Sequence, residues 1–596
     1  MVVLCLAVIP QGAAATSFTA PLMSLFPGAT VAQWAGTSGT EAAAPAAQPV
    51  HFGPRRAVPQ LPCGKNDRPE TGMQGRVPPA DLASGRAALG YNCNLEVVGQ
   101  FPLQGGGSMD AYENCAYYGR GAGAGGTQVL DVSDPANPAS TEMLETRALL
   151  DPWESLRVNV KRGLLVGDSN FNGFLDIYDV SKDCRHPKLL SSTDLAPAQG
   201  HEGWFSPDGM TYYMSRTGPD GTPTVFPVDI SDPAKPHVLA NWTFETQTHG
   251  GFTTEDGRTS YICEQQTPPK DALLIVDTSQ VVDRVPNPKP IVRARIGLQD
   301  NQWCQSALRV TYHGHPYLIQ YGERSGANDC SRVKDNWATF GYPRFYDLAD
   351  ERNPKLVATA MLQSALPEHC AEVHSEGAIN GLGYSVHHCS VDRLYDPTIL
   401  ACSWFFAGMR VLDIRDPHHP VEIGYYNPGL NTVVGTAPRP VIHAERGEIW
   451  FANDARGFYV VRFRDGIWPF PGSARCPEFD DHYYAQYNPH STCPTANLNG
   501  IGKPAPGGVL RTKALRLTRV SLHRSGKRVL VALIASRAGR VVVEVRRGKR
   551  LVARRSARVA AGRDTVRLPA LARGRYVVIV RPVGGGHARR LRLTVD

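Results

Sequence analysis

The sequence lacks any long hydrophobic segment. A membrane-spanning helix needs about 18 or more consecutive apolar residues, whereas the longest apolar candidate, Met1 to Ile9, stops at Pro10. We therefore expect no transmembrane segment. Because 42% of the residues are hydrophobic and only 20% are charged, the composition also excludes a wholly disordered chain.

Several catalytic and metal-binding motifs are missing as well. No Cys-x-x-Cys pair occurs, which removes the usual signature of zinc ribbons and thioredoxin-like redox sites. The Gly-x-Ser-x-Gly and His-Glu-x-x-His motifs are also absent, so standard serine hydrolases and zincins lack support. The glycine-rich run at 119–126 lies between expected strands and precedes no Lys-Ser or Lys-Thr, so we interpret it as a hairpin loop and not a phosphate loop.

Acidic residues are scarce at the C-terminal end. Residues 511–596 contain 24 Lys and Arg against 3 Asp and Glu, hence +21, and since the whole chain carries +8 the other 510 residues carry −13. Aromatic residues are nearly absent from the same stretch, which contains only Tyr576. Two regions of opposite charge therefore share one chain. Without aromatic rings to stack on bases, nucleic acid is not an expected partner.

The 596 residues suffice for two to four domains with sizeable cores. From composition and pattern we expect a signal peptide at 1–15, a disordered Ala/Pro-rich spacer at 16–62, a repeat-built domain at 63–468, a Cys/Pro-rich linker at 469–510 and an Arg-rich β-domain at 511–596.

The N-terminus and the cysteines indicate export. Apolar residues 2–9 precede the small-residue run Gln-Gly-Ala-Ala-Ala, which a signal peptidase accepts. Removing Cys5 with the signal leaves twelve of the 13 cysteines, an even number that suits disulfides in an oxidising compartment. We expect an extracellular or envelope-associated protein. Spacing does not fix the pairing; Cys476 with Cys493 is the favoured local pair, and Cys389 with Cys402 fits two strands of one hairpin.

An internal repeat runs through the middle of the chain. Its units contain a Val/Leu/Ile strand that ends in Asp and leads into a Pro-rich turn, as in Val-Leu-Asp-Val-Ser-Asp-Pro at 129–135. Ser and Asp side chains in such turns accept hydrogen bonds from nearby backbone N–H groups, and Pro ends the strand. The six key residues, spaced 48, 50, 48, 70 and 66 apart, are Asp131, Asp179, Asp229, Asp277, Asp347 and Asp413.

Each unit provides about four strands, and the strand at 458–463 belongs to a seventh unit. Small sheets of this kind cannot bury both faces alone, so seven of them are predicted to stack around an axis. The strand at 95–101 precedes the first complete unit, and we expect it to pair with 458–463 and close the ring. The predicted fold class is all-β, a seven-bladed β-propeller followed by a small β-sandwich domain.

The Asp-Val-Ser-Asp-Pro turn at 131–135 and the Asp-Ile-Ser-Asp-Pro turn at 229–233 resemble those of LVIVD-repeat proteins. The resemblance covers about residues 66–465. It implies a bacterial or archaeal surface or secreted β-propeller and no particular reaction. The units at Asp179, Asp277 and Asp347 depart from the family's Asp-Pro ending.

Residues 511–596 alternate Val, Leu and Ile with Arg between Gly-rich turns, which predicts a small β-sandwich. The region resembles the immunoglobulin-like or fibronectin-like modules of secreted bacterial proteins. A charge of +21 outside the cell would attract cell-wall or envelope polyanions such as teichoic acids and phospholipid headgroups. The alternative is that the arginines reflect coding bias and only keep the domain soluble.

Histidines recur at the expected starts of inner strands. In a propeller these starts surround one mouth of the central channel, where alignment of the units places His201, His249 and His388. Arg216, Glu264, Glu323 and Asp454 fall on loops or strand ends of the same face. Imidazoles beside carboxylates bind transition metals or act as acid and base. Alternatively, these side chains form hydrogen bonds to loops and line a wet channel.

One local segment matches a calcium loop. Oxygen ligands at positions 1, 3, 5, 9 and 12 would come from Asp168, Asn170, Asn172, Asp176 and Asp179, with Gly173 at position 6. The alternative is a simple hairpin, because Asn-Gly between two apolar runs is its strongest signal and strands replace the helices of an EF-hand.

Two function classes follow. The first is a secreted or envelope-associated scaffold that binds an unknown protein or glycan on the propeller face and attaches to the envelope through its cationic domain. The second is a metal-dependent hydrolase or lyase with its site at the channel mouth, formed by His201, His249 and His388. A cofactor is expected only in the form of calcium at the loop or a transition metal at the channel.

Overall fold

The computed structural model describes residues 55–468 and 517–595. Short gaps in this description fall at 120–124, 170–171, 218–222, 266–271, 299–301, 325–329, 331–337, 375–381, 430–434, 445, 465, 526–527, 536–538, 549, 560–561, 569–570 and 583–587. The expected signal peptide, most of the spacer, the linker and the Cys476–Cys493 pair lie outside the described residues. In the described part, no helix has the length and apolar content needed to cross a bilayer.

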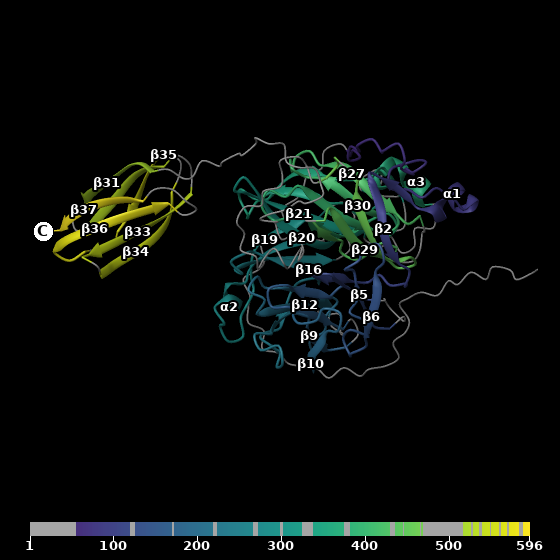
Figure 1. Ribbon diagram of the computed structural model, residues 1–596, viewed down its shortest axis with the longest axis horizontal. Helices are drawn as coiled ribbons and strands as arrows, with labels where there is room; N and C mark the ends of the chain where they lie inside the picture. Colours follow the sequence, from purple (N-terminus) through teal and green to yellow (C-terminus); the bar gives the residue numbers. More distant parts are fainter. Residues whose placement is uncertain are drawn as a thin grey trace, which may run out of the picture.

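The described chain is almost entirely strand, arranged as two groups of antiparallel sheets (Figure 1). Its helical segments are short: α1 (Pro79–Ser84), η1 (Arg86–Leu89), α2 (Ser279–Val282), η3 (Gln363–Ala365), η4 (Pro367–His369) and α3 (Cys370–His374). The all-β class is therefore confirmed.

Seven sheets follow one another between residues 91 and 463. The first three comprise β3 (Met109–Tyr112), β4 (Cys115–Gly119), β5 (Thr127–Asp131) and β6 (Ala139–Leu144); β7 (Arg157–Asn159), β8 (Leu164–Asp168), β9 (Phe174–Asp179) and β10 (Lys188–Asp194); and β11 (Glu202–Phe205), β12 (Thr211–Thr217), β13 (Pro223–Asp229), β14 (His237–Val238) and β15 (Trp242–Thr243). The fourth and fifth comprise β16 (Gln247–Thr253), β17 (Thr259–Gln265), β18 (Ala272–Asp277) and β19 (Ile291–Gly297); and β20 (Gln302–Tyr312), β21 (His315–Arg324), β22 (Arg344–Asp347) and β23 (Lys355–Thr359).

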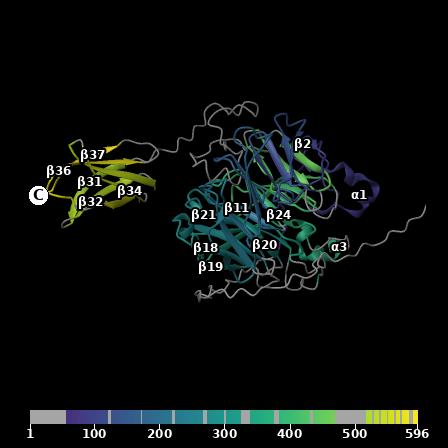
Figure 2. The ribbon, with the colours of Figure 1, turned by 90° about the horizontal axis from the view of Figure 1, so that it is seen from below.

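The last two sheets each add a strand from the N-terminal side. The sixth contains β24 (Val386–Val391), β25 (Ile399–Trp404), β26 (Gly408–Asp413) and β27 (Val421–Asn427), with β1 (Tyr91–Cys93) at its edge. The seventh contains β28 (Val441–His443), β29 (Glu448–Asn453) and β30 (Gly457–Phe463), with β2 (Leu95–Phe101) at its edge. The predicted pairing of 95–101 with 458–463 is confirmed, with Val97 opposite Val461. Figure 1 shows β2 and β30 side by side, and Figure 2 shows β2 beside green strands from later in the chain.

The repeated Asp residues form the predicted turns. Each stands at the end of the third strand of its unit, and its carboxylate accepts a hydrogen bond from the backbone N–H two residues later. The N···O distances are 2.9 Å at Asp131, 2.8 Å at Asp179, Asp229 and Asp277, 2.7 Å at Asp347 and 3.0 Å at Asp413. The same local chemistry thus ends the strand in all six units, including those without the Asp-Pro ending.

Neighbouring sheets pack face to face through shared hydrophobic clusters. Most first strands of consecutive sheets contact each other, in the order β3, β7, β11, β16, β20, β24 and β28. The first and seventh sheets also share one cluster, in which Met109 and Tyr118 pack with Trp450 and Phe458. First strands of consecutive sheets therefore lie next to one another, which brings side chains at their starts close together.

Five disulfides join the described cysteines: Cys63–Cys93, Cys115–Cys184, Cys263–Cys304, Cys330–Cys370 and Cys389–Cys402. The predicted Cys389–Cys402 pair is confirmed, and it links β24 to β25 within one hairpin. Disulfides are typical of proteins in oxidising compartments.

The segment before β1 packs on the sixth sheet. Arg410 of β26 is fully buried between the carboxylates of Glu70 and Glu422, lying 2.6 Å from the latter. A buried cation needs such partners, because burying a charge without one is costly. The N-terminal segment therefore supplies part of the polar interior of this sheet.

The C-terminal residues form two further sheets. One contains β31 (Leu517–Ser525), β32 (Arg528–Ala535) and β35 (Gly562–Arg567); the other contains β33 (Gly539–Arg547), β34 (Arg550–Val559), β36 (Gly574–Pro582) and β37 (Arg589–Val595). Val531 and Leu533 of the first sheet share a single hydrophobic cluster with Val543 and Val578 of the second. The two sheets thus bury one face of each against a common core.

Candidate functional site

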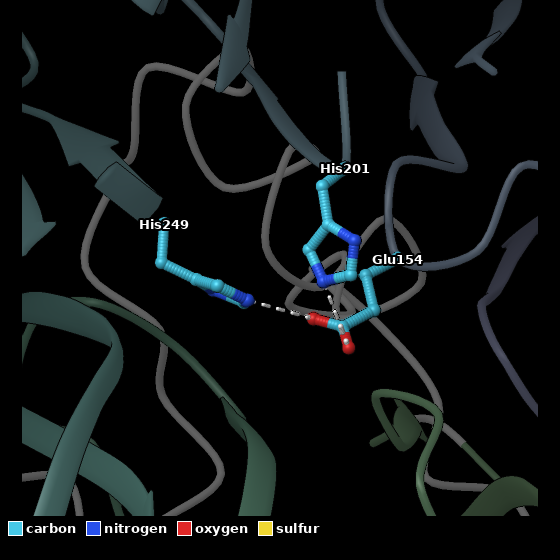
Figure 3. Close-up of side chains that lie close together, drawn as sticks. All are labelled: Glu154, His201 and His249. Atoms are coloured by element: carbon cyan, nitrogen blue, oxygen red, sulfur yellow. Dashed lines mark ion pairs between the residues drawn. The ribbon is translucent and has the colours of Figure 1, made fainter. Parts of the chain in front are cut away.

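Four histidine rings point their Nε2 atoms at the carboxylate of a single glutamate, Glu154. The distances from Nε2 to the nearer Glu154 oxygen are 3.6 Å for His201, 3.7 Å for His249, 3.0 Å for His387 and 3.4 Å for His388. Figure 3 shows this convergence for His201 and His249.

The first strands of four sheets position these side chains. Glu154 lies just before β7 and His201 just before β11, while His249 stands in β16 and His387 and His388 in β24. Four of the five side chains are almost completely buried, and that of His201 is 25% exposed. Solvent therefore reaches the cluster on the side of His201.

Neighbouring groups fix the orientation of two of the rings. Nδ1 of His387 lies 2.9 Å from the carbonyl oxygen of Ala437, and Nδ1 of His249 lies 3.0 Å from a carboxylate oxygen of Glu202. Both oxygens accept hydrogen bonds, so each Nδ1 carries a hydrogen and donates it. In the neutral ring the lone pair then resides on Nε2, the atom that faces the cluster.

A glutamine completes the inner layer. The side-chain amide of Gln305, in β20, donates to Glu154 over 2.6 Å and lies 2.9 Å from Nε2 of His387. Nε2 of His387 also lies 3.0 Å from an oxygen of Glu154. Burial disfavours the charged ring of His387, but the charge of Glu154 outweighs it and raises the pKa of His387, so in the protonated ring Nε2 donates to that carboxylate.

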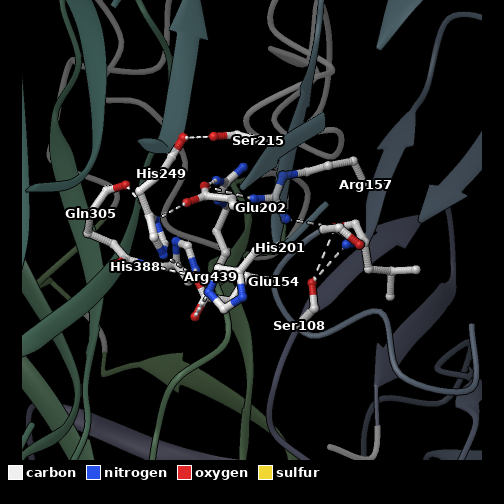
Figure 4. A network of polar contacts seen from close by, with 12 residues as sticks. Ser108, Glu154, Arg157, His201, Glu202, Ser215, His249, Gln305, His388 and Arg439 are labelled. Atoms are coloured by element: carbon white, nitrogen blue, oxygen red, sulfur yellow. Dashed lines mark hydrogen bonds and ion pairs between the residues drawn. The ribbon is translucent and has the colours of Figure 1, made fainter. Parts of the chain in front are cut away.

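Two buried arginines lie behind this layer and share one carboxylate. Arg157 lies 3.1 Å and Arg439 3.7 Å from the same oxygen of Glu202, whose other oxygen contacts His249 (Figure 4). Glu202 is fully buried. It therefore couples the histidine cluster to the cationic groups next to it.

The buried cluster has strongly shifted pKa values. Burial favours the neutral form of Glu154, but the charges of His387 and His201 hold its pKa well below its usual range. Burial and the neighbouring His387 lower the pKa of His388 to about 3, so its ring is neutral. Burial also lowers the pKa of His201. For His249, burial is outweighed by the hydrogen bond to Glu202, and the pKa rises to about 9.

The arrangement fits a metal centre. Glu154, His201 and His249 place one ligand atom each within 4.8 Å of one another, and so do Glu154, His387 and His388. Imidazole nitrogens with one carboxylate suit zinc, copper, iron or nickel. Bonds from the Nδ1 atoms of ligand histidines to a carboxylate and a carbonyl oxygen are the usual outer layer of such centres.

The structure brings together part of the predicted site. His201, His249 and His388 meet at Glu154, as described. Glu323 of β21 lies close by, since its carboxylate contacts Gln265 over 3.4 Å and burial raises its pKa together with the nearby charge of Glu154.

Three other predicted residues take separate positions. Glu264 of β17 pairs with Arg295 over 2.7 Å, and burial raises its pKa to about 7. Asp454 lies in the turn between β29 and β30, where its backbone N–H donates to Gly435. Arg216 lies in β12, paired with Thr224, and its side chain is outside the described part.

The calcium-loop residues lie on a β-hairpin. Asp168 ends β8, and Asp176 and Asp179 belong to β9. Asp176 accepts hydrogen bonds from the backbone N–H groups of Ala148 and Leu149, over 2.7 and 3.0 Å, and Asp179 accepts from Ser181. The Asn172 side chain accepts from the N–H of Phe174. Asn170 is outside the described residues, and those that are described form no metal-ligand group of three.

Sequence reasoning missed Glu154, Glu202, Gln305 and His387. The repeat itself contained the signal for Glu154, which stands 47 positions before His201, as His201 stands 48 before His249. A repeat of histidines does not include a glutamate at the same repeat position. His387 adjoins the predicted His388, and both point to Glu154.

Comparison with known proteins gives limited information. No family model matches the chain, and no curated protein matches it either. Similar solved structures include hydrazine synthase of Kuenenia stuttgartiensis (TM-score 0.43, 11% identity, 61% of this chain and 97% of that one). The Cps50 (Swd1) β-propeller domain of Myceliophteria thermophila has a TM-score of 0.40 at 11% identity, covering 62% and 99%. The periplasmic gluconolactonase PpgL of Pseudomonas aeruginosa has 0.43 at 12%, covering 59% and 90%. At such TM-scores, these structures carry no argument about what the chain binds or catalyses.

Proposed function

We propose that residues 91–463 form a closed seven-bladed β-propeller with a transition-metal centre on its axis. Seven consecutive sheets, contacts between most of their first strands, a cluster shared by the first and last sheets and the β2–β30 pairing support the ring. Closure removes exposed sheet edges. It also directs the starts of the inner strands toward one point, where the histidines lie.

The convergence of four Nε2 atoms on Glu154 carries the assignment of the metal centre. The ligands come from strands far apart in the sequence, and hydrogen bonds to Glu202 and Ala437 orient two of them. Fixing four rings around one carboxylate in a buried space costs side-chain entropy and desolvation. A bound first-row cation, held by His201, His249, His387, His388 and Glu154, would compensate for these costs.

The chemistry that this centre supports best is metal-dependent hydrolysis or elimination. A bound cation supplies Lewis acidity and lowers the pKa of water. The partly exposed side at His201 gives a substrate its approach. Burial and the nearby charge of Glu154 raise the pKa of the buried Glu323 carboxyl, which suits it to general acid–base transfer beside the cluster. Arg157 and Arg439 keep Glu202 ionised against His249.

Metal content of the natively purified full chain tests this proposal. We expect about one transition-metal ion per chain by elemental analysis, and loss of that ion in His249→Ala and His387→Ala. His419→Ala is the matched control, because its side chain is 81% exposed and pairs with the turn residue Asp416. Circular dichroism verifies folding. A folded protein without metal, or equal loss in the control, would contradict the metal centre.

A binding scaffold is the competing function. Rigid propellers need only variable loops to bind a protein or glycan, and the absence of metal in the measurement above would favour this role. The five disulfides support export to an oxidising compartment. We also propose a relationship to LVIVD-repeat proteins and a calcium site formed by Asp168, Asn170, Asn172, Asp176 and Asp179.

We also propose that the C-terminal sheets form a β-sandwich that attaches the protein to envelope polyanions. The charge of +21 over residues 511–596 and the shared core of the two sheets support this. Long-range attraction of this kind is screened by salt. Retention on isolated cell envelopes should therefore disappear at high ionic strength, and salt-independent retention would contradict it.

A further inference from the structure

The C-terminal sheet of β34, β33, β36 and β37 has one apolar and one arginine-rich face. Its inner face contributes Val541, Val543 and Val545 of β33 and Tyr576, Val578 and Val580 of β36 to the shared cluster. Successive side chains of a strand point to opposite faces. The residues between these positions therefore lie on the outer face.

Among the residues whose side chains the structure describes, six arginines lie on that outer face, which we call the arginine face. They are Arg546, Arg554, Arg575, Arg581, Arg590 and Arg592. The register places them beside one another: Glu544 stands opposite Arg554 and Ile579, and Ile579 stands opposite Arg590. Val577 similarly stands opposite Arg546 and Arg592, and Val542 stands opposite Arg581.

The arginine face has one acidic partner among its described residues. Glu544 contacts Arg546 over 3.2 Å and Arg554 over 3.9 Å. Arg575, Arg581, Arg590 and Arg592 are exposed. Six cations against one anion leave a strong local excess of positive charge, which is concentrated on one side of the domain.

Aliphatic side chains fill the spaces between the arginines. Ile579 is only 5% exposed although it lies outside the shared cluster. Long arginine stems cover apolar neighbours while their charged ends stay in water. Arg590 stands directly opposite Ile579, where its stem can cover that side chain. The outer face therefore carries guanidinium groups above a layer of aliphatic side chains.

The two-dimensional spread of these groups favours a planar partner. The arginines occupy all four strands, which lie about 4.8 Å apart. Along β37, Arg590 and Arg592 stand at alternate positions, about 6.7 Å apart, and along β36, Arg575 and Arg581 stand near the two ends of the strand. A linear polymer would contact one row at a time, whereas a surface contacts the whole array. Guanidinium groups suit phosphate oxygens in particular. No aromatic ring stands among the described outer-face positions, so stacking on nucleic-acid bases is not supported.

We propose that the arginine face docks on the phosphate headgroups of an anionic lipid bilayer. This inference rests on the proposed attachment to envelope polyanions and names both the surface and the partner. An arginine near an anionic leaflet strengthens binding by about fivefold at low ionic strength. Four exposed arginines of the face together contribute about two orders of magnitude or more.

The test compares two full-length variants with the same net charge. The face variant combines Arg575→Gln, Arg581→Gln, Arg590→Gln and Arg592→Gln. The control variant combines Arg547→Gln, Arg550→Gln, Arg567→Gln and Arg573→Gln, which are exposed residues at strand ends, at turns or on the other sheet. Binding is measured by co-sedimentation with phosphatidylglycerol-containing vesicles and with pure phosphatidylcholine vesicles.

We expect about a 100-fold loss of affinity for the anionic vesicles in the face variant and less than a tenfold loss in the control. Equal losses would overturn the arginine face while leaving attachment through overall charge intact. A version with Lys at the same four positions should bind the vesicles, which guards against misfolding of the Gln variant; failure of the folded Lys version would also overturn the proposal. Tighter binding of soluble long-chain polyphosphate than of vesicles would assign the face to a linear polymer and contradict the lipid surface.

Discussion

The carboxylate of Glu202 lies 3.0 Å from Nδ1 of His249, and the same side chain contacts Arg157 on its other oxygen. This contact fixes which nitrogen of His249 faces Glu154. Glu202 is thus a positioning residue of the proposed centre and not one of its ligands.

Replacing Glu202 by Gln should weaken metal binding without abolishing it. The amide keeps the size of the side chain but loses the charge that orients His249, and loss of such an outer contact costs about 10- to 100-fold in metal affinity. Competition with a chelator measures the effect. Glu264→Gln is the matched control, since Glu264 is buried but pairs with Arg295. Unchanged affinity in Glu202→Gln would remove this role.

The Cys389–Cys402 disulfide should stabilise both the fold and the site. It closes a loop of 13 residues, which corresponds to about 3 kcal/mol of unfolding free energy. Because Cys389 adjoins His388, the double change Cys389→Ala and Cys402→Ala should also weaken metal binding. Denaturant unfolding and chelator competition give the two values.

Removal of the Cys63–Cys93 disulfide provides the comparison. That bond lies in the N-terminal segment and at β1, away from the histidine-bearing strands. The corresponding Ala pair should lower stability and leave metal affinity unchanged. A parallel fall in affinity would mean that global stability, and not the local anchor of β24, governs the site.

Stability should fall with rising pH in a way that depends on Glu70. Burial, opposed by Arg410, raises the pKa of Glu70 from 4.5 to about 7. The folded state therefore binds more protons than the unfolded state between these values, so the unfolding free energy declines as pH rises through this window, by at most about 3 kcal/mol.

Glu70→Gln should flatten this part of the pH profile. The amide resembles the protonated carboxyl, so the variant gains stability relative to the natural protein between pH 5 and pH 8. Urea unfolding at the two pH values measures the difference. A constant difference between the two proteins would show that Glu70 titrates normally.

Gly99→Ala should destabilise the junction between the last and first sheets. A Cβ at Gly99 would lie 2.1 Å from the backbone oxygen of Pro135, which cannot move away without shifting the turn. We expect a loss of about 1–3 kcal/mol. Gly72→Ala is the control, since its Cβ meets nothing nearer than 3.7 Å; a comparable loss there would exclude the steric explanation.

The sequence predicted the repeated strands because each turn carries its own local chemistry. The Asp131 and Asp229 turns need only neighbouring atoms, namely a carboxylate and the N–H two residues later. The pairing of Val97 with the strand near Val460 was also predictable, since an unpaired edge strand at each end of a repeat array calls for a partner.

The candidate site was only partly predictable. The 48-residue period located His201 and His249, but the side chain on which they converge is a glutamate, and residue type does not follow from the period. The pairing of Glu202 with two arginines depends on side-chain packing across sheets. Such contacts join residues that are hundreds of positions apart, for which a single sequence provides no local signal.

Within the seventh sheet, the strand β2 is synthesised first and its partner β30 last, with more than 350 residues between them. During translation β2 must wait for almost the whole sheet array before it finds its place, and meanwhile its edge stays open to wrong partners. Contacts between distant positions are also slow to form. Within residues 91–463, the order of synthesis therefore places completion of the seventh sheet after that of the other six.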